Sequence, residues 1–299
     1  MKHRMSVETV YESKLSLPLV AKGKVREVYD AGEHLLLVAS DRLSAFDVVF
    51  PDPIPRKGEV LNRLAEYWFG QTSHIVKNHL VTADSSAIPA VAGRNDMQGR
   101  CSLCLKARSF PVECVVRGYL EGSAWKDYQE TGVVSGIALP SGLNRREKLE
   151  MPLFTPSTKA EEGHDEPIDF GRVVELVGQD IAERLRDISI QLYQFAHDQL
   201  LAKGIVLSDT KFEFGLLESG KLVLIDEALT PDSSRFWIAE TYTPTGDAVS
   251  YDKQYVRDYV ETLGWNKQPP APQLPEEVIN GMTKRYVEIY SVITGQALG

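Results

Sequence analysis

The sequence predicts a mixed α+β fold, with a strand-rich first third followed by a larger part in which helices and strands mix. Three observations lead to this prediction. Short apolar runs separated by turn residues indicate strands within residues 19–50. Apolar residues at a spacing of three to four predict one long helix from about Phe170 to Ala202. Two strand-like runs on either side of Ser219-Gly220 predict a β-hairpin.

The first third is expected to contain three short strands and one helix. The strands are predicted around Lys24–Tyr29, His34–Ala39 and Asp47–Phe50, and a turn-forming stretch at residues 30–33 separates the first two. A helix is predicted at roughly Val60–Phe69, because its apolar residues fall on one face.

A change of pattern after the first hundred residues marks the expected domain boundary. Two strands, Cys101–Ala107 and Val112–Arg117, are separated by Ser109-Phe110-Pro111, and proline interrupts strand pairing. We therefore expect residues 1–111 to form an N-terminal β-rich lobe. Residues 112–299 would form a larger C-terminal α/β lobe, ending in helices near Tyr251–Leu263 and Glu276–Ile293.

The predicted hairpin is the stretch that most constrains function. Centring its loop on Ser219-Gly220 places Glu213 directly opposite Asp226, with Lys211 two residues away on the same face. Opposed carboxylates repel, which indicates a cation between them, and oxygen ligands beside substrate phosphates suit Mg²⁺. The alternative is an exposed hairpin whose polar face is merely solvated. The flanking segments add further charged residues, namely Asp209, Glu227, Asp232 and Arg235.

Composition narrows the class of protein. The chain has 299 residues, of which 43% are hydrophobic and 25% charged, values ordinary for a globular protein with one large or two modest domains. The net charge of −9 argues against a general nucleic-acid partner. The sequence contains neither a long apolar run nor the apolar core of a secretory signal, so a cytoplasmic protein without a membrane span is expected. The cysteines are expected to be free thiols: Cys101, Cys104 and Cys114.

Two stretches combine cations with features that bind anions. The turn Lys22-Gly23-Lys24-Val25-Arg26 would let backbone N–H groups and cations approach a phosphate, although solvated basic turns of this kind are commoner. Arg117 ends a predicted strand shortly before Gly122-Ser123 opens a helix, an arrangement suited to phosphate or carboxylate. In the alternative interpretation, Ser123 is only the N-cap of that helix.

Two polar loops are also candidates for binding. The loop at residues 40–47 follows an apolar strand and contains Asp41 and Ser44; it is either a binding loop or a capped turn. A second, proline-punctuated loop at residues 155–166 contains His164, which has no partner at metal-ligand spacing and is expected to be structural or exposed.

Seven motifs in this order carry a family resemblance: GKVREVYD, SDRLSAFD, VRGYLEGSAWKDY, LFTPSTKAEEGHDEP, SDTKFEFG, DEALTPDSSRFW and YDKQYVRDY. Over about Lys22 to Leu263, the chain closely resembles the phosphoribosylaminoimidazole-succinocarboxamide synthase (SAICAR synthetase) family. The resemblance implies a two-lobed α+β architecture related to ATP-grasp enzymes and distantly to kinases. It also implies a reaction of de novo purine biosynthesis, in which CAIR, 5-amino-1-(5-phosphoribosyl)imidazole-4-carboxylate, is joined to L-aspartate. ATP would activate the CAIR carboxylate as an acyl phosphate, giving SAICAR, ADP and phosphate.

The resemblance also implies roles for the residues at matching positions. Glu213 and Asp226 would hold Mg²⁺ in the C-terminal lobe and would form the catalytic centre with Lys211. The residues implied for ATP, which the N-terminal lobe would cover, are Lys22, Gly23, Lys24, Arg26, Lys106, Ala107 and Glu113. The residues implied for the ribonucleotide and L-aspartate are Arg117, Ser123, Arg235, Asp41, Ser44, Lys159 and Asp165.

Two rival functions use the same features. A small-molecule kinase would need the same Mg²⁺–ATP site but would stop at a phosphorylated product. A non-enzymatic nucleotide-binding module would be expected to lose a metal carboxylate or a phosphate lysine, and this chain keeps them. The partners expected of the ligase are ATP, CAIR and L-aspartate, with no nucleic acid or membrane, and the chain is compatible with either a monomer or a homodimer.

Overall fold

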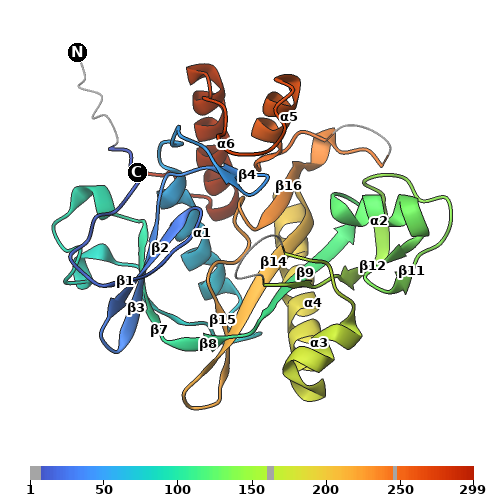
Figure 1. Cartoon of the computed structure of the whole chain (residues 1–299), viewed down its shortest axis with the longest axis horizontal. Helices are drawn as coiled ribbons and strands as arrows, with labels where there is room; N and C mark the ends of the chain where they lie inside the picture. Colours follow the sequence, from blue (N-terminus) through green and yellow to red (C-terminus); the bar gives the residue numbers. More distant parts are fainter. Residues whose placement is uncertain (1–7, 160–164, 245–247) are drawn as a thin grey trace. The chain divides into compact units, whose positions relative to one another are not determined.

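The computed structural model describes residues 8–159, 165–244 and 248–299, which form two compact units (Figure 1). Unit 1 contains residues up to 67, residues 79–106 and residues 252–299, and unit 2 contains residues 68–78 and 107–251. The predicted division lay between residues 111 and 112. In the structure, residues 252–299, which contain the last two helices, belong to unit 1, and residues 68–78 belong to unit 2. Within the described ranges, no helix is long and apolar enough to cross a membrane.

Unit 1 is built on a five-stranded antiparallel sheet with the order β1-β2-β3-β7-β6. The strands are β1 (Leu19–Lys22), β2 (Arg26–Ala31), β3 (His34–Ala39), β6 (Leu80–Thr82) and β7 (Cys101–Leu105). A small separate hairpin consists of β4 (Ser44–Ala45) and β5 (Val48–Val49). The apolar side chains of β2, β3 and β7 form a core with Val91 and Met97. The β-rich character predicted for this part of the chain is confirmed.

Helices and short 3₁₀ turns complete unit 1. They are α1 (Lys57–Gln71), η1 (Ser85–Ala87), η2 (Asn95–Met97), α5 (Gln254–Thr262) and α6 (Glu276–Thr294). The last residues of α1, from Trp68 on, belong to unit 2. Each predicted helix of this unit is present, with ends that differ by a few residues, because the spacing of apolar residues marks a buried face more sharply than it marks the ends.

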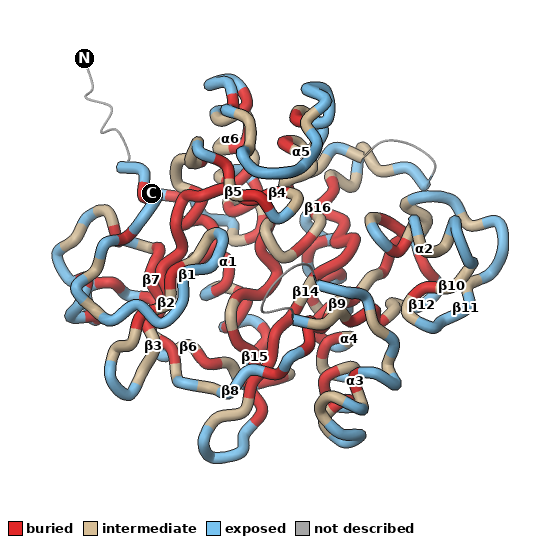
Figure 2. The backbone as a smooth tube through the Cα atoms, in the orientation of Figure 1, coloured by how far each residue is buried: buried red, intermediate tan, exposed pale blue. Residues whose placement is uncertain are grey.

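Unit 2 is organised around β14 (Ile205–Leu217), which hydrogen-bonds to four other strands. Its partners are β8 (Ala107–Ser109), β9 (Val112–Tyr119), β15 (Leu222–Ile225) and β16 (Ser234–Ile238). On its other side β9 pairs with β12 (Lys148–Phe154) and β13 (Ser157–Thr158). Figure 2 shows the buried paths of β9 and β14 through this unit.

Smaller elements of unit 2 support this sheet. They are α2 (Ser123–Thr131), β10 (Val133–Val134), β11 (Ile137–Ala138), α3 (Phe170–Val177), α4 (Gln179–Leu201) and η3 (Ala239–Thr241). The prediction of a single helix from Phe170 to Ala202 is wrong. Gly178 separates α3 from α4 at φ +84°, a conformation that glycine adopts without steric cost.

The predicted register of the central hairpin is also wrong by one residue. Glu213 pairs with Ile225 rather than with Asp226. Gly220 N donates to Leu217 O, Leu217 N donates to Lys221 O, and Gly220 has φ +77°. These bonds close a three-residue loop with glycine in the left-handed region, where a two-residue loop was expected.

Candidate active site

The charged side chains of unit 2 gather on one face of its two central strands. In the β9–β14 pairing, Arg117 lies opposite Asp209 and Val115 lies opposite Lys211. Alternate residues of a strand share a face. This face therefore carries three residues of β14 and three of β9: Asp209, Lys211 and Glu213, and Glu113, Val115 and Arg117. Glu213 lies four positions after Asp209, so the two ends of the face are roughly 13 Å apart.

One end of this face is a cluster of acids around Lys211. Lys211 Nζ donates to Glu113 Oε1 and, at 3.0 Å, to Glu213 Oε1. Lys159 Nζ donates to the other oxygen of Glu213. Burial alone would lower the pKa of Lys211, but Glu213, Glu113 and Asp226 together hold the pKa well above its ordinary value. Lys211 is therefore a permanent cation at neutral pH.

Asp226 reaches this cluster by an irregular backbone. β15 ends at Ile225, and Asp226 then adopts φ +62°, which breaks the alternation of a regular strand. The one-residue register shift would otherwise send its side chain to the opposite face from Glu213. Its charge contributes to the raised pKa of Lys211, which places both carboxylates within electrostatic range of the same ammonium group.

Glu113 belongs to the same cluster. Burial raises the pKa of Glu113, and the charge and hydrogen bond of Lys211 offset only part of that effect. The structure thus brings Glu113, expected at ATP, and Lys159, expected at the ribonucleotide and L-aspartate, together with the three residues expected to form the catalytic centre: Lys211, Glu213 and Asp226.

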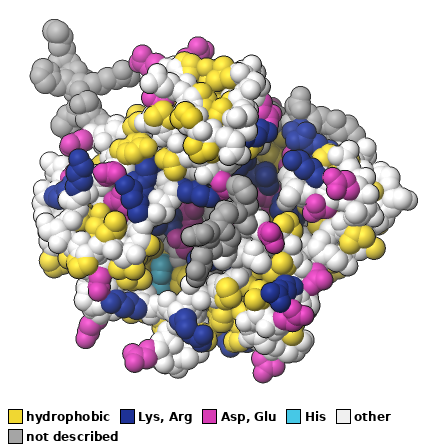
Figure 3. All heavy atoms as spheres, viewed as in Figure 1, with side chains coloured by type: hydrophobic (Ala, Val, Ile, Leu, Met, Phe, Trp, Pro, Cys, Tyr) yellow, Lys and Arg dark blue, Asp and Glu magenta, His cyan; other side chains and the backbone are white. Residues whose placement is uncertain are grey.

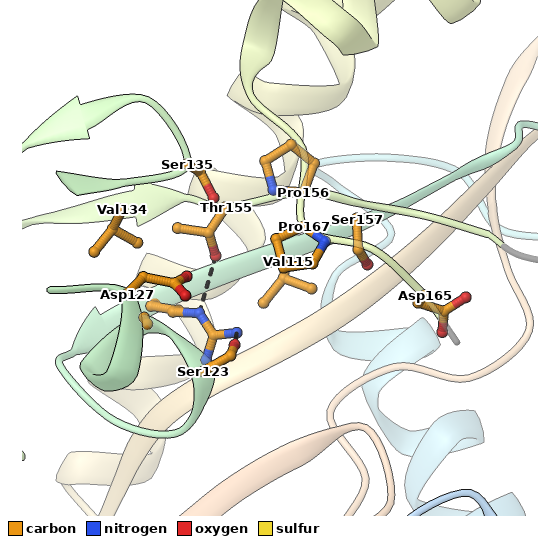
Figure 4. Close-up of a pocket in the computed structure, with 12 residues that line it drawn as sticks. Val115, Ser123, Asp127, Val134, Ser135, Thr155, Pro156, Ser157, Asp165 and Pro167 are labelled. Carbon is orange, nitrogen blue, oxygen red and sulfur yellow. Dashed lines mark hydrogen bonds between the residues drawn. The ribbon is translucent and has the colours of Figure 1, made fainter. Parts of the chain in front are cut away.

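The other end of the face opens into a pocket of about 240 Å³ (Figure 4). Arg117, Ser123 and Asp165 line it, as does Val115 from the centre of the face. Arg117 Nη2 donates to Ser123 Oγ at 3.1 Å and Arg117 Nε donates to Thr155 Oγ1 at 3.0 Å. Three of the predicted substrate-binding residues therefore meet in one cavity.

The start of α2 explains why Ser123 is available to Arg117. Gly122, at φ +67°, is the N-cap, and Ser123 is the first residue of the helix. The alternative in which Ser123 is the N-cap is therefore wrong. A Cβ atom at Gly122 would lie 2.7 Å from Arg235 Nη2, so glycine is required both for the backbone and for the space that this arginine occupies.

Several pocket residues were absent from the sequence-based assignment. Thr155, Ser135 and Asp127 line the cavity together with Ser157, and Figure 4 shows Asp127 and Asp165 at opposite ends of the labelled set. Thr155 and Asp127 lie within two of the motifs that carry the family resemblance. These residues line the pocket because elements far apart in the chain come into contact. The motifs alone do not show which of those elements lie close together.

In unit 1 the glycine-and-cation turn connects β1 to β2. Gly23 N donates to Arg26 O at 2.8 Å, which closes the turn. Lys22 pairs with Glu12 and Lys24 pairs with Asp47, both on the surface. Beneath the turn, Arg42 Nε donates to Lys24 O at 2.9 Å and Arg42 Nη2 donates to Gly23 O at 3.1 Å. Arg42, which sequence analysis did not single out, thus fixes the backbone of the turn from inside the protein.

Asp41 and Ser44 are both buried in unit 1. Asp41 Oδ1 accepts from Gly58 N at 2.8 Å and from Arg100 Nη1 at 2.9 Å, and Oδ2 accepts from Val10 N at 2.8 Å. This geometry gives Asp41 a structural role, and its contact with a substrate stays a prediction. Ser44 begins the small β4–β5 hairpin.

The remaining predicted positions are distributed as follows. Lys106 Nζ pairs with Asp30 Oδ1 at 2.9 Å on the surface of unit 1. Ala107 begins β8 of unit 2. His164 lies outside the described residues. Among the residues that the structure does describe, there is no group of three or more His, Cys, Asp or Glu side chains arranged to hold a metal ion. Figure 3 shows basic and acidic side chains interspersed over the viewed face.

The fold and the site together define an α+β protein with a pocket lined by Arg117 and a lysine–carboxylate cluster on one face of a sheet, an arrangement suited to anionic small molecules. A SAICAR synthetase family model matches residues 19–272. The chain belongs to the SAICAR synthetase family, as its seven motifs indicated.

Relatives and solved structures agree with this assignment. The chain is 53% identical over 293 residues to the phosphoribosylaminoimidazole-succinocarboxamide synthase of Methylococcus capsulatus, with 97% of this chain and 99% of that protein covered. It is 51% identical over 294 residues to that of Thioalkalivibrio sulfidiphilus, with the same coverage. The SAICAR synthase of Saccharomyces cerevisiae complexed with SAICAR superimposes with a TM-score of 0.88 at 38% identity, over 98% of this chain and all of that one.

A SAICAR synthetase in complex with ADP has a TM-score of 0.70 at 26% identity, over 94% of this chain and 100% of that one. The predicted α+β, two-lobed, ATP-grasp-like class is confirmed by these neighbours.

Proposed function

We propose that this chain is an ATP-dependent carbon–nitrogen ligase that joins CAIR to L-aspartate and releases SAICAR, ADP and phosphate, a step of purine biosynthesis. Family membership supports the reaction. One observation of the structure carries the assignment of the site: a single polar face has paired guanidinium groups at one end and the Lys211 cluster at the other. A phosphorylated ribonucleotide laid along this face would have its phosphate at the arginines and its carboxylate toward Lys211.

The chemistry requires activation of a carboxylate, which is a poor electrophile. An oxygen of the CAIR carboxylate attacks the γ-phosphorus of ATP, and ADP leaves. The amine of L-aspartate then attacks the acyl carbon, the C–O bond to phosphate breaks, and the amine loses a proton as the amide forms. Lys211 supports the first step because its raised pKa keeps it cationic where negative charges meet.

Mg²⁺ is proposed at Glu213 and Asp226. Both offer hard oxygen donors, and two carboxylates together with nucleotide phosphates are a usual set for this ion. The charges of both carboxylates act on Lys211, so the two serve the same site. The bound ion would neutralise charge on the ATP phosphates.

ATP contacts are proposed at the turn from Lys22 to Arg26 and at Lys106 and Ala107. Glu113 is proposed near the ATP ribose, although its carboxylate also accepts from Lys211. For the ribonucleotide and L-aspartate, Arg117, Ser123 and Asp165 are supported by the pocket geometry. Arg235 is supported by its ion pair with Asp209, which Arg117 also contacts. Lys159 and Ser44 complete the proposed set, whereas Asp41, whose carboxylate accepts from Arg100 and from two backbone N–H groups, is proposed to be structural. A cytoplasmic location and a monomer or homodimer stay predictions.

The decisive experiment separates the ligase from a small-molecule kinase. Purified protein is incubated with ATP, Mg²⁺ and CAIR, with and without L-aspartate, and the products are identified by mass spectrometry. The ligase should form SAICAR only when L-aspartate is present, whereas a stable phosphorylated product that ignores L-aspartate would identify the kinase. With ¹⁸O in the CAIR carboxylate, label should appear in inorganic phosphate, and its absence would exclude the acyl-phosphate route.

The metal assignment is tested separately. Glu213→Gln and Asp226→Asn should abolish ADP release and should also remove the dependence of ADP affinity on Mg²⁺ in calorimetric titrations. The matched control is Glu218→Gln in the exposed loop of the same hairpin, which should leave both unchanged. Normal ADP release by either site variant would refute the metal assignment.

A further inference from the structure

One buried carboxylate joins the two arginines of the pocket end. Asp209 Oδ2 accepts from Arg117 Nη1 at 3.1 Å and from Arg235 Nη1 at 2.6 Å. The side chain of Asp209 is only 8% exposed. A single oxygen atom therefore orients two guanidinium groups that come from different strands.

The strand pairing makes this arrangement a fixed row. Arg117 of β9 lies opposite Asp209 of β14, and Asp209 in turn lies opposite Arg235 of β16. Residues directly opposite one another on paired strands have adjacent side chains on the same face. The three side chains thus cross the sheet side by side, with the acid between the two cations.

The surroundings hold the row in place. Thr155 and Ser123 accept from the Nε and Nη2 groups of Arg117, and Asp209 accepts from Nη1. On the far side of the row, the missing side chain of Gly122 leaves room for Arg235 Nη2. Burial lowers the pKa of Arg117, nearby Arg235 lowers it further, and Asp209 opposes both effects. Without the acid, two partly buried like charges would be driven apart.

We propose that Asp209 is a positioning residue for the ribonucleotide phosphate: it holds Arg117 and Arg235 side by side so that both can donate to one phosphate group. This rests on the proposed function, in which these arginines bind the phosphate of CAIR. In this role Asp209 acts through the two arginines rather than on the substrate. A charge count alone gives the opposite expectation, because removing a carboxylate beside a phosphate-binding site would increase attraction for the anion.

The test is the affinity of Asp209→Asn for CAIR, measured by calorimetry. The substitution keeps the size of the side chain and removes its charge. Positioning predicts that affinity for CAIR falls by about tenfold or more, as expected when one partner of a buried charge pair is lost, and that KM for ATP is unchanged. Tighter or unchanged CAIR binding would overturn the proposal. Asp198→Asn, an exposed position on α4, is the matched control and should bind CAIR normally.

Two further measurements separate positioning from a general loss of structure. The loss should be confined to the phosphorylated ligand, so the CAIR riboside without its phosphate should bind the variant and the wild type equally. Asp209→Asn should also weaken CAIR binding much less when Arg235 is already replaced by alanine, because Asp209 then positions only one arginine. Equal losses for both ligands, or additive effects of the two substitutions, would overturn the positioning role.

A second variant keeps the proposal testable if Asp209→Asn does not fold. Thr155→Val removes another acceptor of Arg117 without changing any charge, and it should weaken binding of CAIR but not of the riboside. If Arg117→Ala and Arg235→Ala both bind CAIR normally, the proposed phosphate assignment itself fails. If they bind weakly while Asp209→Asn binds normally, only the role of Asp209 fails.

Discussion

Replacement of Asp41 by asparagine should destabilise unit 1 without altering substrate recognition. The carboxylate is fully buried and accepts from Arg100 and from the backbone N–H groups of Val10 and Gly58. Asparagine fills the same space, but it removes the negative charge that faces Arg100 and replaces one acceptor oxygen with a donor. Breaking a buried ion pair from one side costs about 3–5 kcal/mol. For a domain of this size, that corresponds to a fall in Tm of roughly 6–20 °C.

The assay combines unfolding with kinetics. Thermal and urea unfolding measure the loss of stability, and KM values for ATP, CAIR and L-aspartate are measured at a temperature where the variant is folded. The control is Asp30→Asn, which breaks an exposed pair with Lys106 in the same unit and should leave Tm unchanged. A variant of Asp41 with normal Tm and a raised KM for CAIR or L-aspartate would refute the structural role and would favour direct contact with a substrate.

Three other outcomes are expected. In the first, lysine in place of Arg42 cannot donate at once to Gly23 O, Lys24 O and Glu27. Arg42→Lys should therefore raise KM for ATP several-fold, on the order of 1 kcal/mol of binding energy, and leave KM for CAIR unchanged. Equal changes in the two KM values would contradict this prediction. Burial alone would raise the pKa of Glu27, but hydrogen bonds from Ser13, Arg42 and Tyr29 hold it below its usual 4.5. The ionised carboxylate of Glu27 therefore stabilises the folded state above pH 4.5, and this stabilisation disappears as the pH falls through the lowered pKa. Glu27→Gln should be less stable than the wild type at neutral pH, and the urea unfolding curves of the two should converge in acid. Burial raises the pKa of Cys101 to about 12 and raises that of Cys114 too, so thiol reagents should modify neither before unfolding, as mass spectrometry can check.

Local pattern was sufficient to predict most elements of this fold. The apolar spacing predicted the buried face of α4, and Ser219-Gly220 predicted the hairpin. Both signals are short-range, since they depend on residues a few positions apart. The two errors also have local causes. The positive φ of Gly178 splits the predicted helix into two, and that of Gly220 belongs to a loop one residue longer than expected. Glycine is compatible with either outcome at both positions.

The candidate site was predictable in its composition but not in its connections. The charged residues near the hairpin were visible, yet Asp209 could not be separated from its charged neighbours until β9, β14 and β16 were paired. Asp41 illustrates the same limit. Its partners Val10, Gly58 and Arg100 are distant in the sequence, so a buried structural acid and a ligand-binding acid have the same local pattern.

The ion pairs of the candidate residues differ in exposure between the two units. Lys22 and Lys24 of unit 1 pair with acids on the surface, where an ion pair contributes little and long side chains move easily. In unit 2, Arg117 and Arg235 share a buried acid, and Lys211 lies between two acids that are themselves buried. In the proposed site, the first kind of cation would move with the flexible triphosphate of ATP. The second kind is held in place by acids that are costly to leave unpaired, so in the proposed site it would fix where the ribonucleotide lies and where its carboxylate reacts.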